Sequence, residues 1–345
     1  MPLKRRSYIK TATGEDIMKQ VASTLALTGL LAGCAAVEQT PSGATEVSSV
    51  ADPAPAIETS RLPTADEIDG TLINFDSGAT YKGGIRNGKQ HGLGTFRSSD
   101  GYEYTGNWVD GVIQGEGRAR FADGSVYEGE FAGGNPNGLG RIVYADGGSY
   151  EGTWVDGRIE GQGTARYADG LVYTGGFKDS RHDGRGKATR SDGYSYAGDW
   201  ISGVQQGDGK ATYPNGAIYE GTFVNGQANG EGTIVLPDGF LYEGNFQDGQ
   251  ITGKGKATYP NGDVYEGDFV NGVRQGQGTA TYASGGTYTG TFVNGEREGR
   301  GVYQGPDGFV YEGEWKGGQI TGQGVASYPN GTRLEGVFRD GQFVG

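Results

Sequence analysis

The feature that most constrains this chain is a 23-residue unit that recurs without one insertion or deletion over most of the 345 residues. The segment Tyr265 to Thr287, YEGDFVNGVRQGQGTATYASGGT, shows the unit clearly. A Tyr opens eleven such units, at residues 81, 104, 127, 150, 173, 196, 219, 242, 265, 288 and 311, and Leu334 opens a truncated twelfth. A fixed period of this kind is typical of a repeat array, in which each unit packs only on its neighbours.

Positions counted from the leading Tyr show the alternation of a β-strand. Position 3 is Gly in every copy, position 5 is Trp or Phe in all copies but the first, and positions 12, 14 and 21 are Gly in every complete copy. Rings, Ala and Gly alternate with mostly polar residues over 265–269 and again over 278–282, which is the pattern of half-buried strands. Each unit is therefore predicted to be a β-hairpin, with strand A near positions 1–6 and strand B near positions 12–18.

The loops predict the register of the strands. Asp-Gly or Asn-Gly at positions 20–21 favours a three-residue loop between hairpins, which places position 16 opposite position 1 of the next unit. Within a hairpin we expect a four-residue loop at positions 8–11, with position 5 opposite 14 and position 3 opposite 16. Gly267 should then face Ala280 in its own hairpin and Gly255 in the preceding unit. Both choices gather the ring and Gly positions on one face.

The opposite face of the sheet provides an independent check of this register. Position 15 should face position 2 of the next unit, where opposite charges or paired Thr residues would stabilise the sheet by about 0.2–1 kcal/mol per pair. The sequence supplies such partners in seven places: Arg118 with Glu128, Arg141 with Glu151, Lys210 with Glu220, Lys256 with Glu266, Thr95 with Thr105, Thr164 with Thr174 and Thr279 with Thr289.

The alternation of rings and glycines also has a physical explanation. Hydrophobic residues make up 34% of the chain, which is too little for a conventional two-layer core of this length. A single sheet must cover its apolar face with its own side chains, and a large ring can lie flat only over a neighbour without a side chain. We therefore expect the rings to form the core and the glycines to form its floor.

The unit Y-x-G-x-[WF]-x-x-G-x-x-x-G-x-G resembles the MORN repeat, and the resemblance extends from about Tyr81 to the C-terminus. The fold of that family agrees with the derivation above. The resemblance implies that the chain is all-β and forms an elongated, single-layer, twisted antiparallel sheet of tandem 23-residue hairpins. The resemblance also implies a scaffold or interaction module, with membrane-lipid binding proposed for the family. Ser98, Arg190, Leu236 and Gly305 depart from the aromatic residue usual at position 18.

The N-terminal residues 1–33 are predicted to be an export signal. The apolar run from Val21 to Leu31 is too short to span a membrane, and it leads into Leu-Ala-Gly-Cys34, which resembles the bacterial lipobox. Cleavage before Cys34 would leave an N-terminal lipid-modified Cys. Two export routes give the same mature chain: Arg5-Arg6 resembles the twin-arginine motif, and a start at Met18 gives a compact general-secretion signal.

The rest of the chain divides into two parts. Residues 34–69 are rich in Ala, Ser, Thr, Pro and Glu, which favours a flexible tether. Residues 70–345 form the predicted array, which begins with a strand in Gly70–Thr80 that matches the second half of a unit. The array ends with a strand that starts near Leu334.

No residue pattern points to catalysis, a cofactor or a metal. The recurrent Gly-x-Gly is not followed by the helix that a phosphate-binding loop needs. His91 and His182 fall in the expected hairpin loops, four units apart, and are interpreted as ordinary surface residues. Each Asp-Gly turn offers one or two carboxylates, whereas calcium takes about six to eight oxygen ligands. The sequence predicts that the protein is not an enzyme.

The net negative charge of the chain argues against partners that are themselves anionic. The chain has a net charge of −13, and the predicted signal holds five basic and two acidic residues, which leaves −16 on the mature chain. Such a surface repels nucleic-acid phosphates and anionic lipid headgroups, so membrane attachment is expected only through the lipid on Cys34. Ala35 replaces the Asp that, by resemblance to enterobacterial lipoproteins, favours inner-membrane retention. We expect a lipid-anchored scaffold or protein-interaction protein of the bacterial outer membrane, with an unidentified protein partner.

The row of aromatic rings at positions 1 and 5, called the ladder below, suggests an alternative function. A glycan- or peptidoglycan-binding protein could stack sugars on open aromatic faces, and the test is whether the rings are open or buried against their glycines. The candidate binding-face residues are Tyr104, Trp108, Tyr150, Trp154, Tyr196, Trp200, Tyr265, Phe269, Tyr311 and Trp315.

Overall fold

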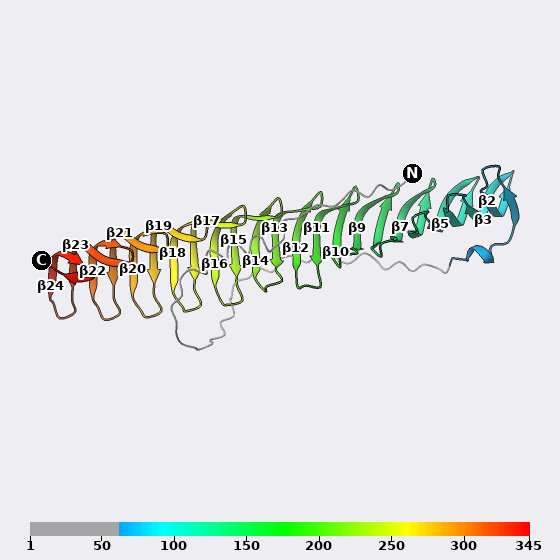
Figure 1. Ribbon diagram of the computed structural model, residues 1–345. Helices are drawn as coiled ribbons and strands as arrows, with labels where there is room; N and C mark the ends of the chain where they lie inside the picture. Colours follow the sequence, from blue (N-terminus) through cyan, green and yellow to red (C-terminus); the bar gives the residue numbers. More distant parts are fainter. Residues whose placement is uncertain (1–61) are drawn as a thin grey trace. The chain divides into compact units, whose positions relative to one another are not determined.

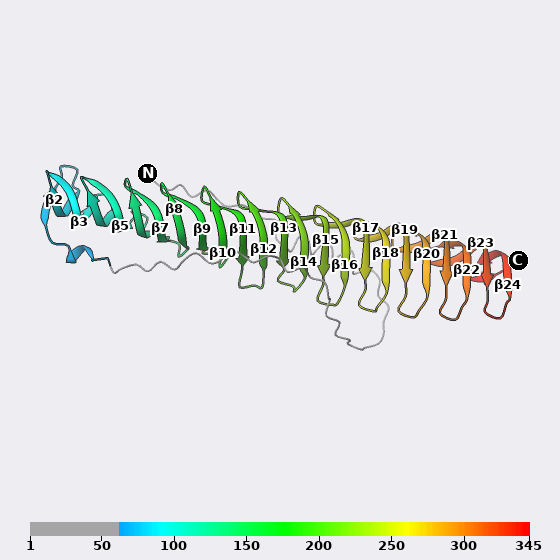
Figure 2. The ribbon, with the colours of Figure 1, turned by 180° about the vertical axis from the view of Figure 1, so that it is seen from behind.

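The computed structural model describes residues 62–345, and this part of the chain contains no α-helix. It consists of 25 β-strands and one short 3₁₀ helix, η1 (Ala65–Glu67). The chain forms two compact units, whose described parts are residues 62–204 and 205–345. Figure 1 and Figure 2 show successive hairpins side by side within each unit. The prediction of an all-β chain of tandem antiparallel hairpins is confirmed.

The first unit holds a capping strand, five hairpins and the first strand of a sixth. Its strands are β1 (Thr71–Asn74), β2 (Thr80–Arg86), β3 (Lys89–Arg97), β4 (Glu103–Val109), β5 (Val112–Arg120), β6 (Val126–Ala132), β7 (Asn135–Val143), β8 (Ser149–Val155), β9 (Arg158–Arg166), β10 (Val172–Lys178), β11 (Arg181–Thr189) and β12 (Ser195–Ile201). Strand β1 pairs with β2 and sets Ile73 opposite Tyr81. The predicted half-unit before the first repeat is therefore present.

The second unit continues the same pattern to the end of the chain. Its strands are β13 (Val204–Thr212), β14 (Ile218–Val224), β15 (Gln227–Val235), β16 (Leu241–Gln247), β17 (Gln250–Thr258), β18 (Val264–Val270), β19 (Val273–Thr281), β20 (Thr287–Val293), β21 (Glu296–Gln304), β22 (Val310–Lys316), β23 (Gln319–Ser327), β24 (Arg333–Arg339) and β25 (Gln342–Phe343). The short β25 pairs with β24 and completes a last, truncated hairpin.

The loops between hairpins have the predicted length. After β5, Phe121 N donates to Ser125 O at 2.8 Å and Gly124 N donates to Phe121 O at 2.9 Å, so three residues form the loop. Gly124 has φ 91°, a left-handed conformation that Gly adopts at little cost. Ala119 then faces Tyr127, which is position 16 opposite position 1 of the next unit. The register between hairpins is confirmed.

The loop inside each hairpin is shorter than expected, and this part of the prediction is wrong. Asp110 (φ 48°) and Gly111 (φ 90°) alone connect β4 to β5, because a two-residue turn with two positive φ angles matches the twist of paired strands. Position 5 therefore faces position 10 instead of 14, and position 3 faces 14 instead of 16. Gly267 faces Gly278 in its own hairpin and not Ala280, while its pairing with Gly255 is confirmed.

The shorter turn leaves two extra residues in strand B. From Gly106 to Trp108 strand A advances by two residues, whereas strand B advances by four, from Gly117 back to Ile113. The irregularity includes the position-12 glycine, such as Gly115 with φ 78°, and extra residues of this kind bend a strand. Position 12 is thus a Gly because the bend requires a left-handed residue there.

The polar face has the predicted pairs. Arg118 lies 3.1 Å from Glu128 and Lys210 lies 3.0 Å from Glu220. The three Thr pairs are hydrogen-bonded at 3.0–3.1 Å: Thr95 with Thr105, Thr164 with Thr174 and Thr279 with Thr289. The remaining two pairs, Arg141 with Glu151 and Lys256 with Glu266, are opposite in register.

The end of the predicted tether nearest the array lies within the described residues and has local structure. Thr64 N donates to Glu67 Oε2 at 2.8 Å at the start of η1, and Ile68 is almost fully buried. The tether predicted for 34–69 therefore does not extend to residue 69. The predicted signal, Cys34 and most of the tether lie outside the described residues.

Candidate functional site

The rings of the leading tyrosines pack flat against the glycines at positions 3 and 14 of their hairpins. A Cβ atom added to Gly106 would be 2.4 Å from the hydroxyl of Tyr104, and one added to Gly117 would be 2.4 Å from the same ring. Only a residue without a side chain fits at either place. The Tyr104 hydroxyl donates to Asn107 O at 3.1 Å, which satisfies a polar group at the edge of the core. Burial raises the pKa of Tyr265 to about 12, so that this phenol remains a donor at physiological pH.

The position-5 rings join the tyrosines into a continuous ladder within each unit. Trp108 meets the rings of Tyr81 and Tyr104 edge-to-face, with centroids 5.5 and 5.4 Å apart. Its indole Nε1 donates to Gly94 O at 3.2 Å. Edge-to-face pairs contribute about 0.5–1.5 kcal/mol each beyond burial. Each position-5 ring therefore links its own hairpin to the one before it.

The bend in strand B brings the position-10 side chain over the face of the leading Tyr ring that points away from the glycines. In the first unit the position-10 residue His182 stacks on Tyr173, with ring centroids 3.6 Å apart. A tyrosine of this ladder thus has glycines on one side of its ring and a position-10 side chain on the other. His182 lies on β11 and is not the surface loop residue that the sequence predicted.

The ten candidate binding-face rings are consequently closed to solvent. None of them is more than 8% exposed. The set is Tyr104, Trp108, Tyr150, Trp154, Tyr196, Trp200, Tyr265, Phe269, Tyr311 and Trp315. A sugar cannot stack on these rings, because glycines and neighbouring side chains already cover their faces. These residues form the core of the sheet, as expected, and the open rings that the glycan alternative requires are not present among them.

A second row of rings, which was not predicted from the sequence, lies beside the ladder. Positions 18 and 22 face one another across the loop between hairpins, as Ser98 and Tyr102 do. Where position 18 is not aromatic, position 22 is: Tyr102, Tyr194, Phe240 and Phe309 follow Ser98, Arg190, Leu236 and Gly305. Every loop therefore carries one ring. We call this set the loop row: Phe75, Tyr102, Phe121, Tyr144, Tyr167, Tyr194, Tyr213, Phe240, Tyr259, Tyr282, Phe309 and Tyr328.

Most of the loop row is accessible, in contrast to the ladder. Phe75 and Tyr167 are 37% exposed and Tyr328 is 40% exposed. Seven others are half-buried, and only Tyr213 and Phe240 are closed. Neighbouring rings touch in places, as Tyr102 and Phe121 do at 5.8 Å. The four units that lack the position-18 aromatic are not distorted, because the same loop hydrogen bonds form there. The four-residue spacing of positions 18 and 22 was the signal for this row.

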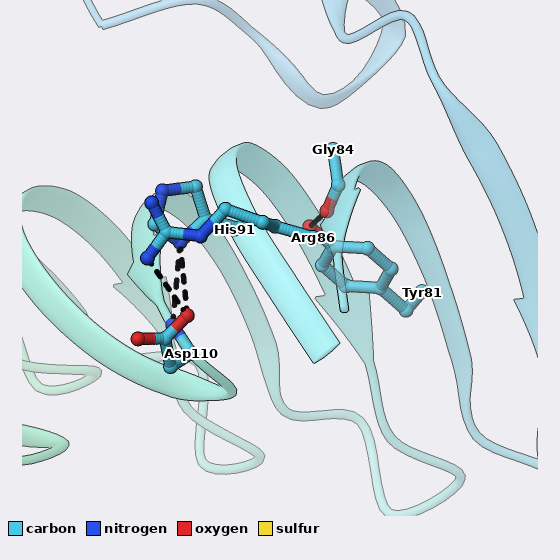
Figure 3. A network of polar contacts seen from close by, with 5 residues as sticks. All are labelled: Tyr81, Gly84, Arg86, His91 and Asp110. Atoms are coloured by element: carbon cyan, nitrogen blue, oxygen red, sulfur yellow. Dashed lines mark hydrogen bonds and ion pairs between the residues drawn. The ribbon is translucent and has the colours of Figure 1, made fainter. Parts of the chain in front are cut away.

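The hairpin tips are joined by a further set of contacts. In Figure 3, His91 on β3 lies beside Asp110 of the next hairpin, with Nδ1 3.5 Å from Oδ1, and Arg86 reaches the same carboxylate at 2.9 Å. His91 is a strand residue, not a loop residue. In six other copies the position-11 side chain accepts a hydrogen bond from the position-7 N–H of the next hairpin: Gln114 from Gly133, Glu160 from Asp179, Asp183 from Ser202, Gln206 from Asn225, Gln275 from Asn294 and Glu298 from Gly317. These tips are thereby tied to their neighbours.

The described residues contain neither a metal-binding cluster nor a helix that could span a membrane. Within 62–345, no group of three or more His, Cys, Asp or Glu residues is arranged to hold a metal ion. The same residues include no helix with the length and apolarity needed to cross a membrane. The loop row is thus the feature of this part of the chain that offers an accessible aromatic surface.

Comparison with known proteins identifies the repeat. A family model described as MORN repeat matches residues 81–101, 104–126, 127–149, 150–172, 173–193, 196–218, 219–240, 242–264, 265–287, 288–310 and 311–333. These matches cover well over half of the chain. No curated protein matches the chain. Tandem repeats of this kind suggest a protein that interacts with proteins or membranes.

Solved structures show only a distant likeness. The TCP10 domain of Danio rerio CPAP in complex with a peptide of Danio rerio STIL is 12% identical, with 77% of this chain and 97% of that chain covered and a TM-score of 0.30. The same domain alone is 16% identical, with 77% and 98% covered and a TM-score of 0.23. A streptogramin B lyase is 11% identical, with 79% and 83% covered and a TM-score of 0.14. Scores this low carry no argument about function.

Proposed function

Because this chain belongs to the MORN repeat family, we propose that it is a non-catalytic, lipid-anchored scaffold of a bacterial cell envelope that binds a protein partner along the loop row. In repeat proteins, some residues build the array and others are left to form an extended binding surface. Positions 1, 3, 5 and 14 build the array here, since their rings and glycines pack on one another. The loop row is the part of the ring-bearing face that stays accessible.

The observation that carries this proposal is the partial exposure of one aromatic ring in nearly every loop. Tyr and Phe are enriched at the centre of protein–protein interfaces, where they supply large contact areas. A series of such rings, at a fixed spacing set by the hairpins, suits a partner that contacts several repeats at once. The closed ladder argues against the glycan alternative, whose named rings have no free face.

The anchor part of the proposal is supported by the sequence. Cys34 follows an apolar run and the small residues Ala32 and Gly33, as in bacterial lipoprotein signals. Each CH₂ of an acyl chain contributes about 0.8 kcal/mol when it enters a membrane, whereas the acidic protein surface would not bind anionic lipids. Attachment through Cys34 would place the loop row in the envelope without direct contact between the repeats and the membrane.

The experiment for the partner is site-specific photocrosslinking in intact cells that produce this protein. A photoreactive phenylalanine analogue would replace Tyr144 or Tyr167 of the loop row, or, as the control, the exposed Arg141 of the opposite face. We expect a protein adduct from the two loop-row sites and none from residue 141. Adducts of equal yield at all three sites would remove the loop row as the binding surface.

The experiment for the anchor uses Cys34→Ser. We expect the native protein to carry acyl chains on Cys34 by mass spectrometry, and the variant to be released from the membrane fraction. An unmodified Cys34 in the mature protein would contradict lipidation.

A further inference from the structure

Two arginines stand on the ring-bearing face of the second unit where other hairpins carry an uncharged residue. Arg274 on β19 and Arg297 on β21 occupy position 10 of consecutive hairpins. Position 10 elsewhere is Gln90, Ile113, Pro136, Ile159, His182, Gln205, Ala228, Ile251 and Ile320. The fold therefore does not require a positive charge at this position.

Aromatic rings and backbone carbonyls hold both guanidinium groups in place. The Cζ of Arg274 lies 5.7 Å from the ring centre of Tyr265 and 5.3 Å from that of Phe292. The Cζ of Arg297 lies 4.2 Å from the ring centre of Trp315. Each side chain donates one hydrogen bond at 2.6 Å, Arg274 to Gly295 O and Arg297 to Gly318 O. Cations are attracted to aromatic faces, so these contacts and the hydrogen bonds preorganise the two groups.

Both guanidinium groups keep N–H donors that no ion pair uses in the described part of the chain. No ion pair there includes Arg274 or Arg297. A guanidinium has five N–H donors in a planar fork that fits a carboxylate, and the single bond of each arginine uses one of them. Both side chains are only half-buried. Each arginine can therefore still receive one carboxylate.

Two nearby carboxylates are engaged by other groups. Asp263 accepts hydrogen bonds from Ala283 N at 2.8 Å and from Asn261 Nδ2 at 3.0 Å. Glu298 accepts a hydrogen bond from Gly317 N at 2.9 Å. Neither carboxylate forms an ion pair with Arg274 or Arg297, so both arginines keep N–H donors for an external ligand.

The spacing of the two arginines selects among ligands. Equivalent residues of consecutive hairpins are two strands apart, or about 10 Å at roughly 4.8 Å per strand. One small anion cannot use both forks at that distance. Same-side residues of an extended β-strand are about 7 or 13 Å apart. In a polyproline II helix, residues i and i+3 lie on the same side and about 9 Å apart, which matches the two arginines.

The surrounding rings suit the same ligand. Arg274 also lies over Tyr259 of the loop row, at 5.9 Å. Burial raises the pKa of Tyr282, and the positive charges of Arg297 and Arg274 act against that rise, so this loop-row ring lies near both guanidiniums. Polyproline II segments bind to surfaces lined by aromatic residues. Rings and charges are therefore combined on one small surface.

We propose that Arg274 and Arg297 bind two carboxylates, three residues apart, of an acidic proline-rich segment in polyproline II conformation that crosses the strands beside Tyr259 and Tyr282. This deepens the proposed function and rests on it, because it assigns a chemistry to the protein partner. Its test uses purified protein and defined peptides. It can therefore fail while loop-row crosslinks in cells persist, which separates the two failures.

The probe is the synthetic peptide Pro-Pro-Glu-Pro-Pro-Glu-Pro-Pro, and the reporter is Trp315. Trp108→Phe, Trp154→Phe and Trp200→Phe together leave Trp315 as the sole Trp of the four, and Phe stands at the same position in most other hairpins. Because Arg297 lies over Trp315, we expect saturable changes in Trp315 emission as the peptide binds. A peptide with Gln in place of both Glu should bind at least tenfold more weakly, and so should one with its two Glu residues two positions apart.

The matched variants are Arg274→Ile and Arg297→Ile, with binding measured by calorimetry in the full chain. Ile251 and Ile320 occupy position 10 in the hairpins on either side, so both variants should fold. We expect each change to weaken peptide binding at least tenfold, while Arg300→Gln, at an exposed site that faces Glu314, leaves it unchanged. Equal binding by the Ile variants would overturn the proposal. So would binding of pyrophosphate or of vesicles with anionic lipid that equals or exceeds peptide binding.

Discussion

The imidazole of His182 lies flat on the phenol ring of Tyr173, with ring centroids 3.6 Å apart and ring planes 12° from parallel. Trp200 and Phe177 meet the imidazole edge-to-face, and a hydrogen bond of 2.7 Å joins its Nε2 to the Tyr167 hydroxyl. Burial lowers the pKa of His182 to about 4. The side chain is therefore neutral at physiological pH and acts as a flat ring in the core.

The first prediction is a loss of stability in mild acid that originates at His182. The unfolded chain takes up this proton near pH 6.5, whereas the folded chain takes it up near pH 4. His182 thus contributes stability above pH 6.5 that is lost as the pH falls toward 4, by about 3 kcal/mol. Denaturant unfolding at a series of pH values between 4 and 8 measures this loss in the free energy of unfolding.

The control for this prediction is His182→Ile, since Ile159 fills the same position in the preceding hairpin. Carboxylates also titrate in acid, so the difference between the two proteins isolates His182. The variant should show a flatter pH profile below pH 6.5. Parallel profiles for the two proteins would show that folding does not lower the pKa of His182.

The second prediction concerns the glycine floor. A Cβ at Gly267 would lie 2.5 Å from Gly278 Cα and 2.6 Å from the Tyr265 hydroxyl. The backbone cannot move away without breaking the strand pairing, so Gly267→Val should cost about 3 kcal/mol, as overpacking does. Thermal or urea unfolding of the purified variant measures the cost.

The neighbouring Glu266→Val is the matched control. Glu266 lies on the polar face, opposite Lys256 on one side and Thr279 on the other. The same new side chain there should cost no more than about 1 kcal/mol, the value of a cross-strand charge pair. If both changes destabilised the protein equally, the assignment of the two faces would be incorrect.

The third prediction compares two Thr pairs of identical register. Thr95 and Thr105 are buried, with hydroxyls 3.0 Å apart, whereas the Thr279–Thr289 pair, at 3.1 Å, is exposed. Thr95→Val should cost about 1–3 kcal/mol, because it leaves the buried Thr105 hydroxyl without its partner. Thr279→Val should change stability by less than about 0.5 kcal/mol. Chemical denaturation of the two single variants gives both numbers.

The double variant Thr95→Val/Thr105→Val completes the third test. When both hydroxyls are replaced by methyl groups of the same shape, the loss should shrink toward zero. A double variant as unstable as the sum of its two single variants would mean that the hydroxyls bond to other groups.

The register between hairpins could be predicted from sequence because one residue type determined it. The position-21 glycine, such as Gly124, defines a three-residue loop, and the charge and Thr pairs on the opposite face confirm the result. The register inside the hairpin could not be read in the same way. Gly111 and Gly115 are both compatible with a loop, and simple alternation assumes that the two strands have equal length. The bend adds two residues to strand B, which alternation does not reveal.

The accessible surface was harder to predict than the core. The ladder rings were recognised, but their exposure depends on the bend, which brings residues such as His182 over the tyrosines. The loop row was missed because position 18 was considered alone, so that Ser98 and Gly305 were interpreted as departures. Tyr102 and Phe309 supply the ring from the other side of the same loop. The arginine pair is visible in the sequence, but only the structure shows which rings it contacts.

The edge-to-face ladder has a mechanical consequence for the second unit. Each hairpin is held by the strands and rings directly beside it, so tension on the C-terminal end loads one hairpin boundary at a time. A detached hairpin releases 23 residues, or about 80 Å of extended chain. A molecule pulled in this direction would lengthen in a series of similar steps, and the hairpins not yet reached would keep their partners. Under load, the second unit would therefore extend hairpin by hairpin instead of unfolding all at once.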